Sequence, residues 1–101
     1  MDIQQTIHEM VHSQPVVLFM KGTPDMPQCG FSAKVAAVLR LLGCEYSAVN
    51  VLDDQDIREG IKVFGQWPTI PQLYVRGELI GGCDIVLEMY ESGELATLLR
   101  Q

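Results

Sequence analysis

The feature that most constrains the fold of this chain is an uninterrupted apolar run, Val16–Met20. Successive side chains of a strand point to opposite faces of a sheet, so a run without polar alternation predicts a strand buried on both faces. A second candidate strand, Tyr46–Val51, follows after a helical pattern. Two strands joined by a helix predict a βαβ unit with parallel strands and a right-handed crossover. The sequence therefore predicts the α/β class, with one sheet covered by helices.

Apolar residues recur at helical spacing in three segments of the first two thirds of the chain. The first segment ends near Pro15 and the second closes at Gly43. The third begins at a cap formed by Asp53-Asp54 and stops at Gly65. In chain order, the apolar positions are Ile3, Ile7, Met10 and Val11; Val35, Val38, Leu39 and Leu42; and Ile57, Ile61 and Phe64.

The last third of the chain predicts a hairpin followed by a helix. Gln72–Val75 and Glu78–Gly81 have the pattern of two strands that turn at Arg76-Gly77. A helical stretch starts near Cys83 and is interrupted at Gly93. The element order is then α-βαβ-α-ββ-α, and we expect the 101 residues to form one domain with a mixed sheet.

Cys29 lies where a loop ends and the second helix begins. The first amides of a helix have no partner within it, and the helix dipole favours an anion there. A cysteine in this position typically has a pKa lowered to ~3.5–7.5 because its thiolate is stabilised. Lys21 adds positive charge, and Cys29 is therefore the candidate catalytic residue. Gly30 and Ser32 are expected to leave room for a ligand, and Ser32 offers no second thiol, so a disulfide at Cys29 needs another thiol, such as Cys83.

The net charge excludes some classes of partner. The chain has 13 acidic and 7 basic residues, a net charge of −6. It therefore lacks the basic surface that nonspecific nucleic-acid binding or an anionic membrane requires. We expect no secretory signal and no membrane span, because Val16–Met20 is too short for either. The expected location is the cytoplasm, or an organelle matrix if a leader has been removed.

Two other groups of residues bear on metal chemistry. Cys29, Cys44 and Cys83 are an odd number, which disfavours a disulfide framework, and they are too few for a four-thiolate site. Cys44 matches no motif and is expected to be structural. The run from His8 to His12 has the H-E-x-x-H form of zinc proteases. The apolar stripe of that helix leaves both histidines toward water with no cleft, so we do not expect a protease.

Four motifs, in this order along the chain, resemble those of the monothiol glutaredoxins with a Cys-Gly-Phe-Ser active site. The motifs are Lys21-Gly22-Thr23-Pro24 with Pro27, Cys29-Gly30-Phe31-Ser32, Trp67-Pro68-Thr69-Ile70-Pro71, and Gly81-Gly82-Cys83-Asp84. The resemblance covers nearly the whole chain. It implies the thioredoxin-like fold, with a four-stranded mixed sheet flanked by helices and an extra N-terminal helix. It also implies a cis peptide bond between Ile70 and Pro71.

The same resemblance implies two ligands, glutathione and a 2Fe–2S cluster, and a role in cluster assembly, storage or transfer. Such a cluster takes four ligands, usually thiolates. With Cys29 as the metal ligand of each chain, two chains and two glutathiones complete the set. The cluster-loaded form is therefore expected to be a homodimer. Apo iron–sulfur acceptor proteins and a BolA-like protein are the implied protein partners.

Glutathione is an anionic peptide, so its site needs cationic groups and backbone partners. A helix N-terminus and a nearby carboxylate suit its γ-glutamyl end. The candidates are Lys21 and Arg58 for the glycyl carboxylate, with Lys62 weaker; the backbone of Ile70 for the peptide groups; and Cys83 and Asp84 for the γ-glutamyl end.

Some alternatives stay open. The runner-up function is a glutathione-dependent thiol–disulfide oxidoreductase that removes glutathione from protein thiols through Cys29. A third is a regulatory partner that passes iron status to a BolA-like protein. The Cys83 side chain either belongs to the ligand site or only packs, and Trp67 is expected to pack rather than contact a ligand.

Overall fold

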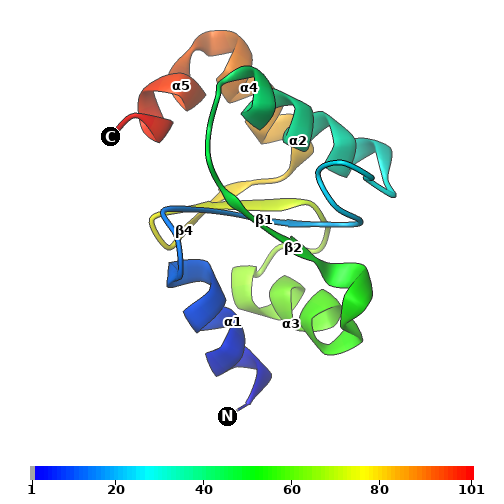
Figure 1. Cartoon of the computed structure of the whole chain (residues 1–101). Helices are drawn as coiled ribbons and strands as arrows, with labels where there is room; N and C mark the ends of the chain where they lie inside the picture. The colour runs from blue at the N-terminus through cyan, green and yellow to red at the C-terminus, as the bar shows by residue number, and fades with distance from the viewer. Residues whose placement is uncertain (1) are drawn as a thin grey trace.

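A computed structural model describes residues 2–101 and centres on a four-stranded sheet in the order β2-β1-β3-β4 (Figure 1). β1 is parallel to β2, antiparallel to β3, and β3 is antiparallel to β4. The strands are β1 (Val16–Met20), β2 (Ser47–Asn50), β3 (Gln72–Val75) and β4 (Glu78–Gly81). The mixed sheet and the βαβ unit predicted from the sequence are thus confirmed.

Helices cover both faces of this sheet. Figure 1 shows α1 and α3 on one side and α2, α4 and α5 on the other, which is the thioredoxin-like arrangement with an N-terminal helix. None of the helices in residues 2–101 has the length and apolar character needed to cross a membrane. The helices are α1 (Ile3–His12), α2 (Gly30–Leu41), the 3-10 turn η1 (Val51–Asp53), α3 (Gln55–Gly65), α4 (Cys83–Ser92) and α5 (Glu94–Leu99).

β1 is the centre of the core, as its sequence predicts. All five of its residues are buried. Leu18 and Met20 pack with the residues of α2 and α4, whereas Val17 and Phe19 pack with those of α1 and α3. This split follows from the alternation of side chains along a strand. A strand with a helical layer on each face has no polar position, and Lys21 follows directly after its last residue.

Two predicted boundaries differ from the structure by one residue each. The second strand ends at Asn50 rather than Val51, because the Asn50 carbonyl oxygen Oδ1 accepts from the backbone N–H of Leu52 and starts η1. Asp54 caps α3 as predicted, accepting from two amides of the first turn. Gly65, however, is the last helical residue, and Gln66 takes the left-handed conformation that ends the helix (φ 50°).

Gly65 is required for packing and not for a turn. A Cβ at this position would lie 2.5 Å from Tyr74 Oη and 2.8 Å from Gln72 Oε1. Helix α3 therefore ends directly against the buried polar side chains of β3. The end of α3 is joined to the next segment by a hydrogen bond from the backbone N–H of Trp67 to the carbonyl of Lys62 (3.1 Å).

Candidate functional site

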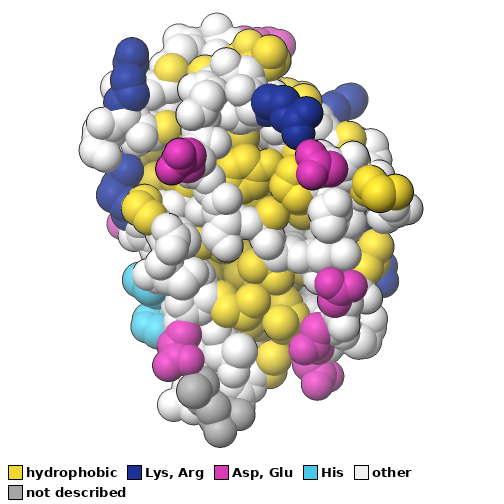
Figure 2. Space-filling model, in the orientation of Figure 1, with side chains coloured by type: hydrophobic (Ala, Val, Ile, Leu, Met, Phe, Trp, Pro, Cys, Tyr) yellow, Lys and Arg dark blue, Asp and Glu magenta, His cyan; other side chains and the backbone are white. Residues whose placement is uncertain are grey.

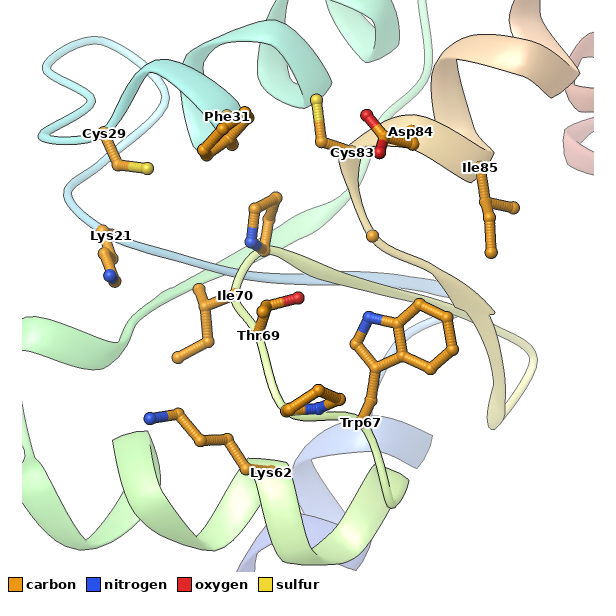
Figure 3. A pocket seen from close by; sticks show the side chains of 13 residues that line it. Lys21, Cys29, Phe31, Lys62, Trp67, Thr69, Ile70, Cys83, Asp84 and Ile85 are labelled. Carbon is orange, nitrogen blue, oxygen red and sulfur yellow. The ribbon is translucent and has the colours of Figure 1, made fainter.

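A pocket of about 500 Å³ lies between the N-terminal ends of α2 and α4 and the segment that precedes β3 (Figure 3). It brings together four of the motifs that are far apart in the sequence. Its lining residues are Lys21, Cys29, Phe31, Lys62, Trp67, Pro68, Thr69, Ile70, Pro71, Gly82, Cys83, Asp84 and Ile85. Of the predicted site residues, Lys21, Cys29, Ile70, Cys83 and Asp84 are in this lining and Arg58 is not.

Cys29 is the N-cap residue of α2, with an extended backbone (φ −151°, ψ 134°), and it is partly exposed. The backbone N–H of Ser32, in the first turn of α2, is the largest influence lowering the pKa of the thiol below its ordinary value. Burial opposes this effect, while the Phe31 amide, the Ser32 hydroxyl and the charge of Lys21 add to it. The free amides at the helix start thus stabilise the thiolate, as the sequence predicts.

Ser32 does not leave room for a ligand, so that expectation was wrong. Its side chain is fully buried, and its Oγ accepts a hydrogen bond from the backbone N–H of Lys21 at 3.1 Å. Gly22 is held in turn by Asn50, whose Oδ1 accepts from the Gly22 N–H at 2.9 Å. Gly22 has a φ of +91°, and a Cβ there would lie 2.5 Å from the Met26 carbonyl oxygen. The loop around the thiol is therefore fixed by buried contacts at both ends.

The opposite wall of the pocket is the start of α4. Gly82 is the N-cap, and no side chain caps the first turn. Asp84 is exposed in that turn and Figure 3 shows its carboxylate at the rim of the pocket. The Cys83 side chain is buried in the core cluster, and burial raises the pKa of its thiol. Cys83 thus both packs in the core cluster and lies in the pocket lining, and its role toward a ligand stays a prediction.

The segment from Trp67 to Pro71 forms the third wall. Its Ile70–Pro71 peptide bond is cis, as the resemblance implies. Trp67 does more than pack in the core, because its indole lines the pocket (Figure 3). The indole nitrogen would be 3.2 Å from a Cβ at Gly82, so the two walls meet at these residues. Only a glycine fits at this contact without displacement.

The cationic residue of α3 that lines the pocket is Lys62 and not Arg58. Its Nζ lies 3.2 Å from Glu59 Oε2. Arg58 is half-buried on the same helix but outside the lining, and its predicted ligand role stays a prediction. In the sequence, Lys62 is the weaker candidate, one turn after Arg58 on the helix that leads to Trp67. In the structure that turn adjoins the pocket wall, because the Lys62 carbonyl accepts a hydrogen bond from the Trp67 N–H.

The remaining candidate metal ligands of the described residues do not lie together in one site. No cluster of three or more histidine, cysteine, aspartate or glutamate residues suited to a metal ion occurs within residues 2–101. His8 and His12 are exposed on α1 with their rings 4.4 Å apart, away from the pocket. Cys44 is half-buried against the core, and burial raises the pKa of its thiol.

Comparison with known proteins identifies the family. A sequence profile described as glutaredoxin matches residues 16–80. "Probable monothiol glutaredoxin 2" of Rickettsia typhi is 55% identical over 94 residues, which are 93% of this chain and 85% of that protein. This chain belongs to the monothiol glutaredoxins. "Glutaredoxin-related protein 5, mitochondrial" of Danio rerio is 54% identical over 97% of the chain.

The monothiol glutaredoxin domain also occurs in longer proteins. The chain spans 64% of the Danio rerio protein and only 20% of "Monothiol glutaredoxin-S11" of Oryza sativa, to which it is 52% identical over 98% of its own length. Among solved structures, reduced poplar apo GrxS14 matches with a TM-score of 0.83 and 48% identity, covering 97% of this chain and 90% of that one.

Two further solved glutaredoxins match in fold at lower identity. A buckwheat glutaredoxin–glutathione complex has a TM-score of 0.84 at 28% identity, covering 96% of this chain and 86% of that one. The holo form of poplar glutaredoxin C1 has a TM-score of 0.86 at 29% identity over the same shares of the two chains.

Proposed function

We propose that this monothiol glutaredoxin binds glutathione in the pocket beside Cys29 and, as a pair of chains, carries a 2Fe–2S cluster for assembly, storage or transfer to apo iron–sulfur proteins. The observation that supports this best is one thiol of lowered pKa on the wall of a pocket with opposite charges at its two ends. We place the protein in the cytoplasm, although some relatives are named as mitochondrial.

The pocket residues suit the chemistry of glutathione. Lys21 and Lys62 can each donate a charge-assisted hydrogen bond to the glycyl carboxylate, and Arg58 is a further candidate beyond the lining. The uncapped amides at the start of α4 suit the other carboxylate, and the Asp84 carboxylate suits the ammonium group. Between these ends, the backbone at Ile70 is placed to pair with the peptide groups. A solved relative holding glutathione supports this assignment.

The cluster role follows from counting thiolates. A 2Fe–2S cluster usually takes four. Each chain would supply Cys29, which is partly exposed at the start of α2, whereas Cys83 is buried and Cys44 lies outside the pocket lining. Two chains and two glutathione thiolates complete the set. The residues around Cys29 lower the pKa of its thiol and so favour the thiolate, which is the form that binds a metal. A BolA-like protein is a proposed alternative partner for the second chain.

An oxidoreductase activity is the second candidate, because a thiolate is also a nucleophile. Cys29 would attack the glutathione sulfur of a protein–glutathione disulfide, forming Cys29–S–S–glutathione and releasing the protein thiolate. A second glutathione thiolate would then attack this bond, regenerating the Cys29 thiolate and releasing glutathione disulfide. Residue 32 is a serine and offers no second thiol, so the mixed disulfide between Cys29 and glutathione persists until a second glutathione attacks it.

Anaerobic reconstitution with iron, sulfide and glutathione tests the proposal. The wild type and a Cys44→Ser control are expected to turn brown with equal iron content, and Cys29→Ser is expected to stay colourless while remaining folded. A folded Cys29→Ser protein that retains the cluster would refute the ligand assignment. A colourless wild type that rapidly turns over a protein–glutathione disulfide would instead favour the oxidoreductase.

A further inference from the structure

Gln72, the first residue of β3, is fully buried and lies outside the pocket lining. Its Nε2 donates hydrogen bonds to the carbonyl oxygens of Trp67 (3.0 Å) and Thr69 (3.3 Å). Its Oε1 accepts a hydrogen bond from Tyr74 Oη at 2.8 Å. Both donor hydrogens and one acceptor site of the amide are therefore used. A buried amide is costly unless it is paired in this way.

The position of Gln72 is fixed from behind by Tyr74. The Tyr74 ring packs edge-on against Phe19 with 5.7 Å between the ring centres, and against Phe64 at 6.0 Å. Burial raises the pKa of Tyr74 to about 12, so its hydroxyl stays protonated and donates at neutral pH. The space for this hydroxyl exists because residue 65 is a glycine. The amide of Gln72 thus has one orientation, with its two donors toward the Trp67 segment.

The segment that Gln72 holds is neither helix nor strand, and its first residue, Trp67, donates a backbone hydrogen bond to the carbonyl of Lys62 in α3. Residues 67–71 lie between the end of α3 and the start of β3. All five of them line the pocket, with Trp67, Thr69 and Ile70 labelled in Figure 3. Pinning the Trp67 and Thr69 carbonyls on the side away from the pocket fixes the backbone between them. The wall is therefore set by a residue that no ligand in the pocket touches.

We propose that Gln72 is a positioning residue that fixes the Trp67–Ile70 wall and thereby sets the affinity of the pocket for its peptide ligand. The ligand half of this inference rests on the proposed binding of glutathione. The positioning half rests only on the hydrogen bonds from Gln72 to the two carbonyls.

Trp67 gives a direct measurement, because it is the only tryptophan of the chain. In Gln72→Met, both carbonyls lose their donor while the side-chain volume is nearly kept. We expect acrylamide to quench the Trp67 fluorescence roughly twofold more efficiently than in the wild type, without any ligand present. We also expect the glutathione dissociation constant, measured by calorimetry, to rise about tenfold, the loss that one or two net hydrogen bonds represent.

Tyr74→Phe is the matched control. It removes one buried hydrogen bond from the same network but leaves both contacts from Gln72 to the segment. We expect wild-type quenching and a less than threefold change in glutathione affinity. Equal changes of quenching and affinity in Tyr74→Phe and Gln72→Met would overturn the inference. They would mean that losing any hydrogen bond of the network displaces the wall, whether or not Gln72 still holds the two carbonyls. A folded Gln72→Met protein with wild-type quenching would overturn it as well.

If Gln72→Met does not fold, Gln72→Glu decides by the same quenching and affinity criteria, since it keeps the shape and the acceptor for Tyr74 but replaces the donating amide nitrogen with an oxygen. If the wild type binds no glutathione, the proposed function fails, while the quenching comparison still decides whether Gln72 positions the wall.

Discussion

The backbone N–H of Lys21 donates a hydrogen bond to the side-chain hydroxyl of Ser32, with 3.1 Å between the two heavy atoms. Ser32 is fully buried in the first turn of α2, and its backbone N–H is the largest influence lowering the pKa of the Cys29 thiol. One residue therefore links the cation at the end of β1 to the thiolate at the start of α2. The serine that stands in place of a second cysteine has a structural role of its own.

Ser32→Ala should raise the pKa of Cys29 only slightly. The substitution removes the hydroxyl, which lowers the Cys29 pKa less than other groups do. It keeps the backbone amide of residue 32, which lowers that pKa the most. The Cys29 thiol should therefore still titrate below the ordinary range of a thiol. The pH dependence of alkylation, followed site by site by mass spectrometry, measures this, with Ser92→Ala as a control at an exposed position.

The three cysteines of the wild type should also differ in reactivity. At neutral pH Cys29 should be alkylated first, because its pKa is lowered and a larger fraction is thiolate. Burial raises the pKa of Cys44 and of Cys83, so these thiols should react more slowly. Alkylation of Cys44 ahead of Cys29 would contradict the assignment of the reactive thiol.

Removing a pocket cation should weaken glutathione binding. A hydrogen bond to a charged group contributes ~1.5–3 kcal/mol, so Lys21→Ala and Lys62→Ala should each raise the dissociation constant roughly tenfold or more. Arg58→Ala should have the smaller effect, because Arg58 is outside the pocket lining. Glu59→Gln is the informative partner variant: it frees Lys62 from its ion pair at 3.2 Å and should tighten binding.

Calorimetry at two salt concentrations measures these changes. High salt should weaken binding by the wild type, because part of the attraction is screened. Affinities unchanged in both lysine variants would remove these residues from the site. A larger loss of glutathione affinity for Arg58→Ala than for Lys62→Ala would support the prediction from sequence that Arg58 is the stronger candidate.

Much of the fold could be predicted because its signals are local. Val16–Met20 has no polar position, Asp54 precedes a helical pattern, and Cys29 lies at a loop–helix junction. Each of these dictates a structure through its neighbours in sequence. The motif residues of the pocket were likewise found, because the resemblance supplied which distant segments meet.

The features that were missed depend on contacts between distant segments. Gly65 looks like a helix stop in sequence, but its small size is needed against Tyr74 and Gln72, which follow in β3. Ser32 looks like a residue that leaves space, yet it is buried by a partner eleven positions earlier. Which of Arg58 and Lys62 lines the pocket depends on how α3 faces it, which helical periodicity alone does not fix.

Gly65→Ala should destabilise the fold. Its new Cβ would meet Tyr74 Oη and Gln72 Oε1, both held by a buried hydrogen bond. Overpacking of this kind typically costs ~1–3 kcal/mol. Gly60→Ala, in the same helix, meets the terminal Cδ1 of Ile7 at 2.8 Å and gains up to ~1 kcal/mol of helix propensity, so it should cost less. Urea unfolding of both variants tests this, and equal midpoints would contradict the packing role of Gly65.

Assembly should depend on both the cluster and glutathione. Each chain is expected to place one thiolate, Cys29, on the cluster, so the other ligands must come from a second chain and from two glutathiones. The apoprotein is expected to be a monomer and the loaded form a dimer with one cluster per two chains. Because glutathione binds reversibly, cluster stability should rise with its free concentration, and leaving it out should prevent assembly even with iron and sulfide in excess. Light scattering combined with iron, sulfide and glutathione assays on the same fractions measures all of these quantities. A stable loaded monomer, or a loaded dimer without glutathione, would refute the shared-cluster proposal while leaving the family assignment intact.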